Sequence, residues 1–598
     1  MYSGSDSNEV NKIFSRFPIP DSRFPIPDSR FPIPDSRFPI PDSRLPIPDS
    51  RFPIPSIENC CSIVLFLIST SNVRVLLLSP LFTKSYWSFD KAIELIGCKV
   101  AQPPMGLITV AAILPQTWEF RLVDRNVRLE TDADWEWADV VIVSGMIVQK
   151  PDMLHLIGEG KRRGKLVAVG GPYVTSIAEE AQEAGVDFLI LDEGEITLPR
   201  FVEALAVGES SGVFRANGER ADVTKTPIPR YDLLELDAYS EMSVQFSRGC
   251  PFECEFCDIS VRYGRKPRTK TPAQVLAELQ TLYNLGWRLP VFIVDDNFIG
   301  NKRHVKLLLQ ELAPWMAEHG YPFPLSTEAS LNLAEDDELL ELMIAANFSS
   351  VFVGIETPNT DSLTLTKKHQ NTRQPLADAV EKINRAGLRV MAGFIIGLDG
   401  EKPGAGDRII DFVEATAIPH TVFSMLQALP NTALWDRLKQ EGRLLEGNEE
   451  NINQTTLTNF IPTRPIEQLA QEYVSCFWEL YKPESYLGRL YRHYLNMKPK
   501  PHHPKLVMPK LIYFWALLII IWRNGIKRQT RFQFWGQLFS ILRHNPQVWK
   551  RYLSDHAYLE HFLEYRQIVH DQIPAQLTEF LAALAKTRPL AEVAGEVY

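Results

Sequence analysis

The stretch Ser247-Arg-Gly-Cys250-Pro-Phe-Glu-Cys254-Glu-Phe-Cys257-Asp places three cysteines in the spacing C-x3-C-x2-C. The residues before it, Met242-Ser-Val-Gln-Phe246, alternate in polarity and predict a strand. The cysteines therefore follow a strand end, where parallel α/β folds hold their functional groups. Three thiolates on one short loop favour an iron–sulfur centre, because these clusters select cysteine ligands. A [4Fe–4S] cluster held by three cysteines keeps one iron free to bind a small molecule.

Zinc is the main alternative metal for these cysteines. A structural zinc site uses four protein ligands, commonly in C-x2-C pairs. No second pair and no nearby histidine follow the loop in this chain. In a third interpretation the cysteines bind nothing and are buried as small apolar side chains, but that does not explain why they cluster on a polar loop.

The cysteine loop resembles that of the radical S-adenosylmethionine (SAM) enzymes. The resemblance implies a [4Fe–4S] cluster on Cys250, Cys254 and Cys257, whose open iron chelates the amino and carboxylate groups of SAM. It also implies that the reduced cluster cleaves SAM to a 5′-deoxyadenosyl radical. A reducing partner protein is then needed to supply the electron.

Composition limits the class of protein. The 598 residues predict several domains, since domains average roughly 150 residues. Their 63 basic and 73 acidic residues give a net charge of −10, which does not support nucleic-acid binding. Seven cysteines form no disulfide framework, and a cluster that needs thiolates predicts a reducing, cytoplasmic compartment. No signal peptide is evident at the start of the chain.

Residues 1–72 are predicted to be a disordered tail. A heptapeptide, Phe-Pro-Ile-Pro-Asp-Ser-Arg, begins at Phe17 and repeats in near-identical copies to residue 55. Two prolines per repeat fix φ and remove backbone donors, so an extended chain is expected and a coiled coil is not. A translated DNA repeat or a misplaced start is the favoured interpretation, and a proline-recognition ligand is the alternative.

Residues 73–221 alternate apolar runs with helical patterns, which predicts a doubly wound parallel sheet of α/β class. The expected strands are 73–78, 120–123, 140–143, 166–170 and 188–191. Ligands of such sheets bind at the carboxyl ends of the strands. Those ends include Ser144-Gly145, Gly170-Gly171 and Asp192-Glu-Gly-Glu195, and their small residues let a large flat ligand approach the backbone.

This segment resembles the cobalamin-binding domain that precedes many radical SAM domains. The resemblance implies that Ser144, Gly145, Gly170 and Gly171 surround the nucleotide tail of cobalamin. Many members carry D-x-H-x-x-G, whose histidine ligates cobalt, whereas this chain has Asp124-Arg-Asn126 and no histidine. The resemblance therefore implies cobalamin without a histidine lower ligand, and it leaves a degenerate domain that binds nothing as the alternative.

Residues 222–240 contain Pro227 and Pro229 without a clear period and are predicted to link two domains. Residues 241–428 then contain about six strand–helix units, which predict a partial (β/α)6 barrel. Several predicted strand ends of this barrel carry polar residues or glycine. A helix cap or a solvated loop is the alternative role for each carboxylate among them.

The radical SAM resemblance assigns SAM contacts to these strand ends. Asp295, Asp296 and Asn297 match the motif that receives the SAM amino group. Glu328 and Glu356 match positions that bind ribose or substrate, and Gly393, Ile395 and Gly397 match a motif that packs on adenine. The glutamate that follows in the family falls one residue late here, at Glu401. No residue is assigned a catalytic acid or base role.

Residues 429–598 lack strand patterns and are predicted to be helical. Segments 429–444 and 85–90 resemble those of a cobalamin-linked subgroup that includes hopanoid methylases. Residues 511–522 are twelve uninterrupted apolar residues, fewer than the roughly 20 that span a bilayer. Basic residues flank them and Trp and Tyr are interleaved, so 505–531 is either a membrane-surface segment or a buried core helix.

Together these features predict a cobalamin-dependent radical SAM enzyme. The resemblance implies methylation of an unactivated carbon of a hydrophobic small molecule or lipid, with a hopanoid-like compound as the expected substrate. The protein is expected in the cytoplasm or at the inner face of the membrane. A non-methylating radical SAM cyclase or oxidase, and a non-catalytic iron–sulfur module, are the alternatives.

Overall fold

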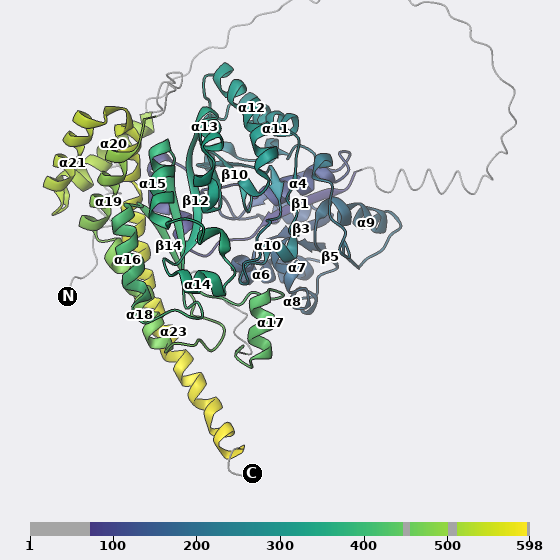
Figure 1. The fold of residues 1–598 in the computed structure, drawn as a ribbon. Helices are drawn as coiled ribbons and strands as arrows, with labels where there is room; N and C mark the ends of the chain where they lie inside the picture. The colour runs from purple at the N-terminus through teal and green to yellow at the C-terminus, as the bar shows by residue number, and fades with distance from the viewer. Residues whose placement is uncertain (1–71, 446–454, 500–510, 595–598) are drawn as a thin grey trace, which may run out of the picture. The chain divides into compact units, whose positions relative to one another are not determined.

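The computed structural model describes residues 72–445, 455–499 and 511–594, and these all fall in one compact unit (Figure 1). Apart from Asn72, the predicted tail lies outside the described residues. So do residues 505–510 of the predicted membrane-surface segment. The domain boundaries proposed above therefore stay predictions.

The first sheet has six parallel strands in the order β2-β1-β3-β4-β5-β6. They are β1 (Arg74–Ser79), β2 (Glu119–Asp124), β3 (Val140–Ser144), β4 (Leu166–Gly170), β5 (Phe188–Ile190) and β6 (Gly212–Phe214). The five predicted strands are present. The edge strand β6 was not predicted, because none of its three residues is buried and they carry no apolar pattern. The strand order reverses at β1 and β3, which is where open α/β sheets bind ligands.

Helices cover both faces of this sheet. One face packs against α4 (Met105–Ile113) and α9 (Gly194–Ala206). The other packs against a second set, α5 (Asp132–Trp137), α6 (Lys150–Arg162), α7 (Pro172–Ser176) and α8 (Glu179–Glu183). Successive residues of β1 alternate between the two cores, which explains its continuous apolar sequence and confirms the doubly wound prediction.

The second sheet also has six parallel strands, in the order β14-β13-β12-β11-β10-β7. They are β7 (Met242–Val244), β10 (Val291–Ile293), β11 (Leu325–Glu328), β12 (Phe348–Glu356), β13 (Arg389–Ile396) and β14 (His420–Met425). Helices alternate with them, namely α11 (Pro272–Asn284), α12 (Lys302–Glu318), α13 (Asp337–Ala345), α15 (Leu376–Ala386) and α16 (Ala405–Thr416). Within the described chain β7 and β14 end the sheet without pairing to each other, which agrees with a partial barrel.

The cysteine loop is closed by a small sheet that the sequence did not predict. Strand β7 ends at Val244, two residues earlier than expected, and β8 (Ser247–Arg248) then pairs antiparallel with β9 (Arg268–Thr269). The backbone leaves the barrel sheet here because the Phe246 N–H donates to Asp295 Oδ1, at 2.8 Å, instead of to a neighbouring strand. The loop with the three cysteines lies between β8 and β9.

The predicted linker is packed and not extended. It forms three short 3-10 helices, η4 (Val223–Lys225), η5 (Tyr231–Leu233) and η6 (Leu236–Ala238). The buried Tyr231 donates to the Ser243 carbonyl at 2.8 Å, and the buried Tyr239 donates to Asp124 Oδ2 at 3.1 Å. The segment therefore binds to both sheets.

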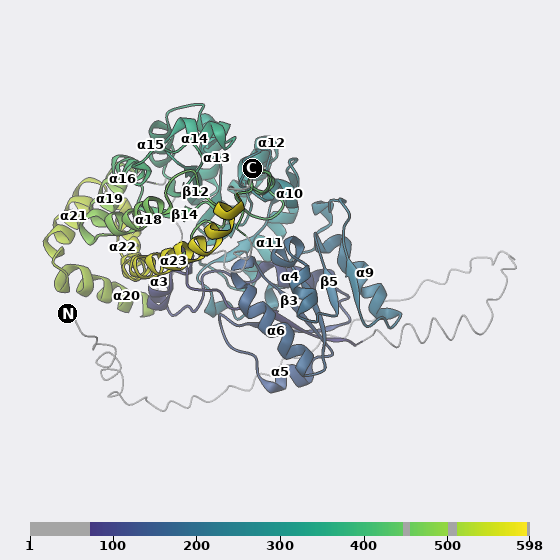
Figure 2. The ribbon, with the colours of Figure 1, turned by 90° about the horizontal axis from the view of Figure 1, so that it is seen from below.

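The region after the barrel is helical, as predicted. Its helices are α17 (Ala433–Gln440), α18 (Ile466–Leu480), α19 (Pro483–Asn496), α20 (Leu511–Trp522), α21 (Arg531–His544), α22 (Trp549–Asp555) and α23 (Tyr558–Ala594). Helices α18 and α23 lie side by side in both views (Figures 1 and 2). Helix α20 coincides with the predicted apolar run, but only Ala516 and Ile520 are buried, which contradicts the buried core helix. None of the helices described has the length and apolarity to cross a membrane.

Candidate cofactor-binding site

The loop with Cys250, Cys254 and Cys257 is fixed at both ends. At its start the Asp295 carboxylate accepts hydrogen bonds from Phe246 N, at 2.8 Å, and from Ser247 Oγ, at 2.6 Å. Further along, the buried Glu255 carboxylate accepts two hydrogen bonds from Arg437 of α17, at 2.9 and 3.2 Å. Charged and buried hydrogen bonds of this kind give the cysteines a fixed position relative to the barrel rim.

Amide donors lie next to two of the thiols. Asn297 Nδ2 is 3.7 Å from Cys250 Sγ, and Gln370 Nε2 is 3.5 Å from Cys254 Sγ. The buried Lys368 forms an ion pair with Glu356, and its charge also interacts with the thiols of Cys254 and Cys257. N–H donors and a cation next to sulfur stabilise the negative charge that thiolate ligands bring to a cluster.

Two of the three thiols hold their protons more tightly than an ordinary cysteine does. Burial raises the pKa of Cys250, and raises that of Cys257 to about 12. Iron must therefore displace these protons when it binds. Among the described residues, no three His, Cys, Asp or Glu side chains converge to hold a single metal ion. Cysteines that each bind a different iron of a cluster do not need to converge on one point.

The carboxyl ends of β10 and β11 bring four predicted SAM-binding residues together. Asn297 contacts Cys250, and Asp296 Oδ2 accepts a hydrogen bond from Gly249 N at 3.4 Å. Burial raises the pKa of Asp295 to about 7 and that of Asp296 to about 6. For Glu328, burial and the charges of Asp296 and Asp295 raise the pKa to about 7.

Glu328 differs from its neighbours in its contacts. Asp295 uses its carboxylate to hold the cysteine loop, whereas the Glu328 carboxylate forms no hydrogen bond with another described residue. A carboxylate that lines a cavity beside two others suits a cationic ligand group, which lowers the repulsion between them. Its position and its environment therefore fit the sulfonium or ammonium group of SAM.

The other predicted SAM contacts lie on neighbouring strands but do not line the large cavity. Glu356 is at φ +65° and pairs with Lys368. Gly393 leaves room for the Phe352 ring, since a Cβ there would be 2.8 Å from the ring. Ile395 packs in the same cluster as Phe256 of the cysteine loop, and Gly397 N donates to Glu401 Oε2 at 2.9 Å. Their roles in binding SAM stay predictions.

A cavity of about 2700 Å³ lies between the two sheets. It is lined by Glu328 at the end of β11, by apolar residues inside the barrel such as Phe292, Phe352 and Met391, and by the loops after β3, β4 and β5. Pockets for one small ligand measure about 300–1,000 Å³. The volume therefore accommodates more than one ligand at the same time.

The predicted cobalamin loops meet at this cavity. Ser144, Gly145, Gly170 and Gly171 all line it. Gly171 has φ +96°, and a Cβ there would be 2.6 Å from Ser144 Oγ, so the two loops lie in direct contact. A side chain at Gly170 would be 3.0 Å from the Ile190 carbonyl oxygen. Both glycines are therefore needed for the close approach of β3, β4 and β5.

Asp124 and Asn126 are engaged within the protein. Asp124 accepts hydrogen bonds from the backbone and side chain of Asn126, at 3.0 and 2.7 Å. Asn126 Oδ1 accepts from Phe82 N at 2.9 Å, and its Nδ2 also donates to the Pro80 carbonyl at 3.2 Å. These side chains hold the loop after β1 against the loop after β2, so neither is placed as a cobalt ligand.

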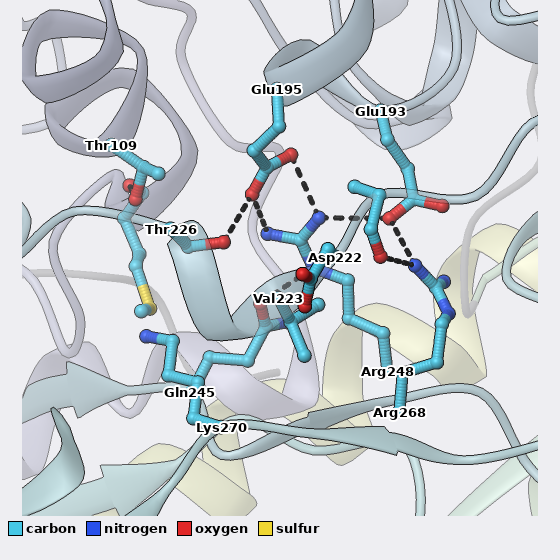
Figure 3. A network of polar contacts seen from close by, with 12 residues as sticks. Thr109, Glu193, Glu195, Asp222, Val223, Thr226, Gln245, Arg248, Arg268 and Lys270 are labelled. Carbon is cyan, nitrogen blue, oxygen red and sulfur yellow. Dashed lines mark hydrogen bonds and ion pairs between the residues drawn. The ribbon is translucent and has the colours of Figure 1, made fainter. Parts of the chain in front are cut away.

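Arg248 joins the cysteine loop to the first sheet (Figure 3). Its guanidinium contacts Glu195 at 2.7 and 2.9 Å and Glu193 at 3.0 Å, and Glu193 also binds Arg268 at 2.8 Å. Thr226 Oγ1 donates to Glu195 at 2.7 Å. Burial raises the pKa of Glu195, but the bonds and charge of Arg248 outweigh it and hold that pKa at about 2. The carboxylates after β5 thus fix the arginine two residues before Cys250.

Sequence patterns did not identify Arg248, Lys368 or Gln370. Arg248 lies between a serine and a glycine and Lys368 between a lysine and a histidine, and these neighbours do not distinguish them from surface residues. A basic residue inside the cysteine motif, two positions before Cys250, was the one feature that pointed to Arg248.

Comparison with known proteins identifies the class of this chain. Residues 98–202 match the B12 binding domain family, residues 244–413 match the Radical SAM superfamily, and residues 432–575 match a domain of unknown function, DUF4070. The chain is 64% identical over 510 residues to an uncharacterized methyltransferase of Synechocystis, covering 85% of this chain and 95% of the relative. It is 36% identical to the hopanoid C-2 methylase of Rhodopseudomonas palustris, covering 77% and 88%. The chain therefore belongs to the cobalamin-dependent radical SAM methyltransferase family.

Solved structures share this fold. The radical SAM methyltransferase TsrM from Kitasatospora setae, determined with cobalamin and a [4Fe–4S] cluster, aligns with a TM-score of 0.52 at 16% identity, covering 82% of this chain and 99% of that one. The cobalamin-dependent SAM radical enzyme OxsB aligns with a TM-score of 0.54 at 15% identity, covering 87% and 81%. Both confirm the order of a cobalamin-type sheet followed by a radical SAM barrel.

This family membership makes the chain an enzyme whose cofactors are a [4Fe–4S] cluster, SAM and cobalamin. The site fits all three. Three thiols with amide donors and a buried cation suit the cluster, and Glu328 suits a cationic group of SAM. Glu193 lines the cavity and its Oε1 is buried without a hydrogen-bond partner in the described chain, which suits a ligand rich in amide donors such as cobalamin.

Proposed function

We propose that this enzyme methylates an unactivated carbon of a hydrophobic substrate, with a hopanoid-like lipid as the substrate class. The observation that supports it best is the cavity of about 2700 Å³, which joins the cobalamin loops to Glu328 and to an apolar barrel interior. The similarity to a hopanoid C-2 methylase at 36% identity agrees with a lipid substrate. When bound, the reduced cluster supplies the electron that cleaves SAM to a 5′-deoxyadenosyl radical, and cobalamin supplies the methyl group.

The residues of the chain position and shield these groups. Cys250, Cys254 and Cys257 hold the cluster, and Asp295 and Arg437 keep their loop in place. Glu328 binds a cationic group of SAM, while Ser144, Gly145, Gly170 and Gly171 border the cobalamin side of the cavity. Phe352, Met391 and other apolar side chains exclude water from the substrate.

A reducing protein is the proposed electron donor. Because a lipid substrate resides in membranes, the proposal includes peripheral association with the inner face of the membrane.

Product analysis tests this proposal. Purified protein with reconstituted iron and cobalamin is given SAM, a reductant and a lipid extract under anaerobic conditions. We expect 5′-deoxyadenosine and a lipid that is heavier by one methylene group, and neither from Cys254→Ala. Formation of 5′-deoxyadenosine with a product that gains no methylene would indicate a cyclase or oxidase. Failure to cleave SAM would contradict the enzymatic proposal.

A further inference from the structure

Exposed apolar side chains are concentrated on α20 and α21. Exposed side chains along these two helices and the π-helix between them, η11 (Arg523–Lys527), are Leu511, Phe514, Trp515, Leu518, Trp522, Ile526, Phe532, Phe539 and Leu542. We call this set the α20–α21 surface. It includes both tryptophans that are exposed among the described residues. The elements that carry these side chains contact one another, and exposed apolar side chains concentrated on adjoining elements are typical of a binding site for a partner or a membrane.

The exposed residues of α20 follow helical spacing. Leu511, Trp515, Leu518 and Trp522 recur every three or four residues, so they lie along one face of the helix. Their exposed fractions are 72%, 56%, 40% and 51%. Tyr513, Ala516 and Ile520 point elsewhere and line the large cavity. Phe514 of the α20–α21 surface also lines the cavity, so this surface borders the cavity at α20.

The charge of this region is opposite to that of the whole chain. Residues 511–554 contain seven Lys and Arg and no Asp or Glu, whereas the protein has a net charge of −10. Lys527, Arg531, Arg543 and Lys550 are exposed. Tryptophans beside basic residues, next to an apolar face, are the pattern of a segment that lies in the headgroup region of an anionic bilayer.

We propose that the α20–α21 surface docks this enzyme on an anionic lipid bilayer. Docking places the cavity wall formed by Tyr513, Ala516 and Ile520 next to the bilayer, which contains the apolar substrate. It specifies the surface for the peripheral association proposed above, and it rests on that proposal for its biological purpose. Because none of the described helices can span the bilayer, the contact lies within its interface.

Vesicle flotation of the full-length protein tests this proposal. We expect the protein to float with vesicles made of equal parts phosphatidylcholine and phosphatidylglycerol, and less with phosphatidylcholine alone. The apolar variant Trp515→Ser/Trp522→Ser/Phe532→Ser should lower partitioning by at least about tenfold. The charge variant Lys527→Glu/Arg531→Glu/Arg543→Glu should lower it by roughly a hundredfold on anionic vesicles, and high salt should weaken the wild type.

A matched control replaces three equally exposed apolar residues elsewhere in the molecule. Leu129, Val207 and Leu365 are 58%, 69% and 57% exposed. Leu129→Ser/Val207→Ser/Leu365→Ser should bind vesicles as the wild type does. Equal loss in this control, or a wild type that floats with neither vesicle, would overturn the proposal. The proposal would also be overturned if sedimentation showed a dimer for the wild type and a monomer for the apolar variant, since a second copy of the chain would then cover the surface.

SAM cleavage without vesicles separates this proposal from the function of the enzyme. We expect the wild type and both surface variants to form 5′-deoxyadenosine at the same rate, because their substitutions lie on exposed side chains outside the cofactor site. Cleavage without vesicle binding would refute the docking surface alone. Vesicle binding without cleavage would refute the proposed reaction and leave the surface in place.

Discussion

At the residue scale, Glu328 carries the most specific prediction about SAM. Its pKa of about 7 means that the carboxyl group loses its proton as the pH rises through neutrality. We expect SAM affinity of the cluster-containing protein to rise with pH from about 6 to 8, because only the carboxylate attracts a cation. Glu328→Gln should lower the affinity about tenfold or more and reduce this pH dependence to the part that Asp295 and Asp296 contribute, as measured by equilibrium dialysis.

Glu311 on α12 provides the control for that experiment. It is exposed, so Glu311→Gln should leave both the affinity and its pH profile unchanged. A Glu328→Gln protein that binds SAM with the wild-type pH profile would mean that another carboxyl group, such as Asp296, receives the cation.

Arg248 carries a prediction about stability. Arg248→Met removes the arginine from Glu195, whereas Glu193 keeps its contact with Arg268, and breaking one buried pair costs about 3–5 kcal/mol. Glu195 has a lowered pKa of about 2, so its stabilisation is present above pH 4.5 and is lost as the pH falls towards 2. In the variant Arg248 no longer offsets burial, so this pKa rises, and the loss of stability between pH 4.5 and 2 should be smaller than in the wild type.

The exposed ion pair of Arg162 and Glu159 gives a comparison for Arg248. Arg162 is 67% exposed, so Arg162→Met should leave the stability nearly unchanged. If Arg248→Met costs no more than this, the contact in Figure 3 does not hold the cysteine loop to the first sheet.

Residue identities in the site were predictable where a motif fixed them. The cysteine spacing and the glycines after β3 and β4 stand out in the sequence because few other residues fit their positions. Partners that lie far apart in the chain were not predictable. Glu356 was expected to bind SAM or substrate, but its pairing with Lys368 depends on the left-handed backbone at Glu356, which no sequence pattern indicated.

At the element scale, the conformation of the cysteine loop depends on Gly249. This residue has φ +97°, and a Cβ would be 2.7 Å from the Gly264 carbonyl oxygen. Gly249→Ala must therefore displace the backbone between β8 and Cys250. We expect this variant to lose most of its reconstituted iron, as measured by iron analysis and visible absorption.

Gly218 is a matched control for Gly249. It has φ +86° but nothing lies within 4 Å of the position of a Cβ. Gly218→Ala therefore adds the same backbone strain, about 1 kcal/mol, without a steric clash, and it should keep its iron. Equal iron content in the two alanine variants would show that the loop tolerates the displacement.

Elements with a strong apolar period were predicted from the sequence, and short ones were not. The buried strands of the first sheet and helix α20 matched their expected ranges within a few residues, and the barrel sheet has the six strands expected. Strands β6, β8 and β9 have two or three residues each and depend on pairing with distant segments. The linker was predicted from its prolines and its lack of a clear period, but the pattern did not indicate that Tyr231 and Tyr239 are buried against the two sheets.

At the scale of the whole molecule, the cavity and the helical region share one polar cluster. The cavity extends from Glu328 at the end of β11 to Arg389 and His420, which are the first residues of β13 and β14. At that far end Arg389 pairs with Asp555 of α22, and Tyr494 of α19 donates to Asp555 at 2.7 Å. The helical region thus closes the end of the barrel opposite the cysteine loop.

This arrangement predicts that Asp555→Asn loosens the helical region while the barrel stays folded. Burial raises the pKa of Asp555, but the effects of Arg389, His420 and the Tyr494 hydroxyl are larger together, so the pKa lies below its usual value. The stability that the Asp555 carboxylate contributes is therefore lost in acid. Loss of this charge leaves Arg389 buried without its anion, at a cost of about 3–5 kcal/mol. Hydrogen exchange should then increase in α19, α22 and the start of α23, but not in the barrel strands β10–β12 or in the first-sheet strands β1–β5. Asp571→Asn, at a 62% exposed carboxylate of α23, should change none of these rates. Exchange that increases equally in both sheets would mean that Asp555 stabilises the whole protein and not the closure of the barrel.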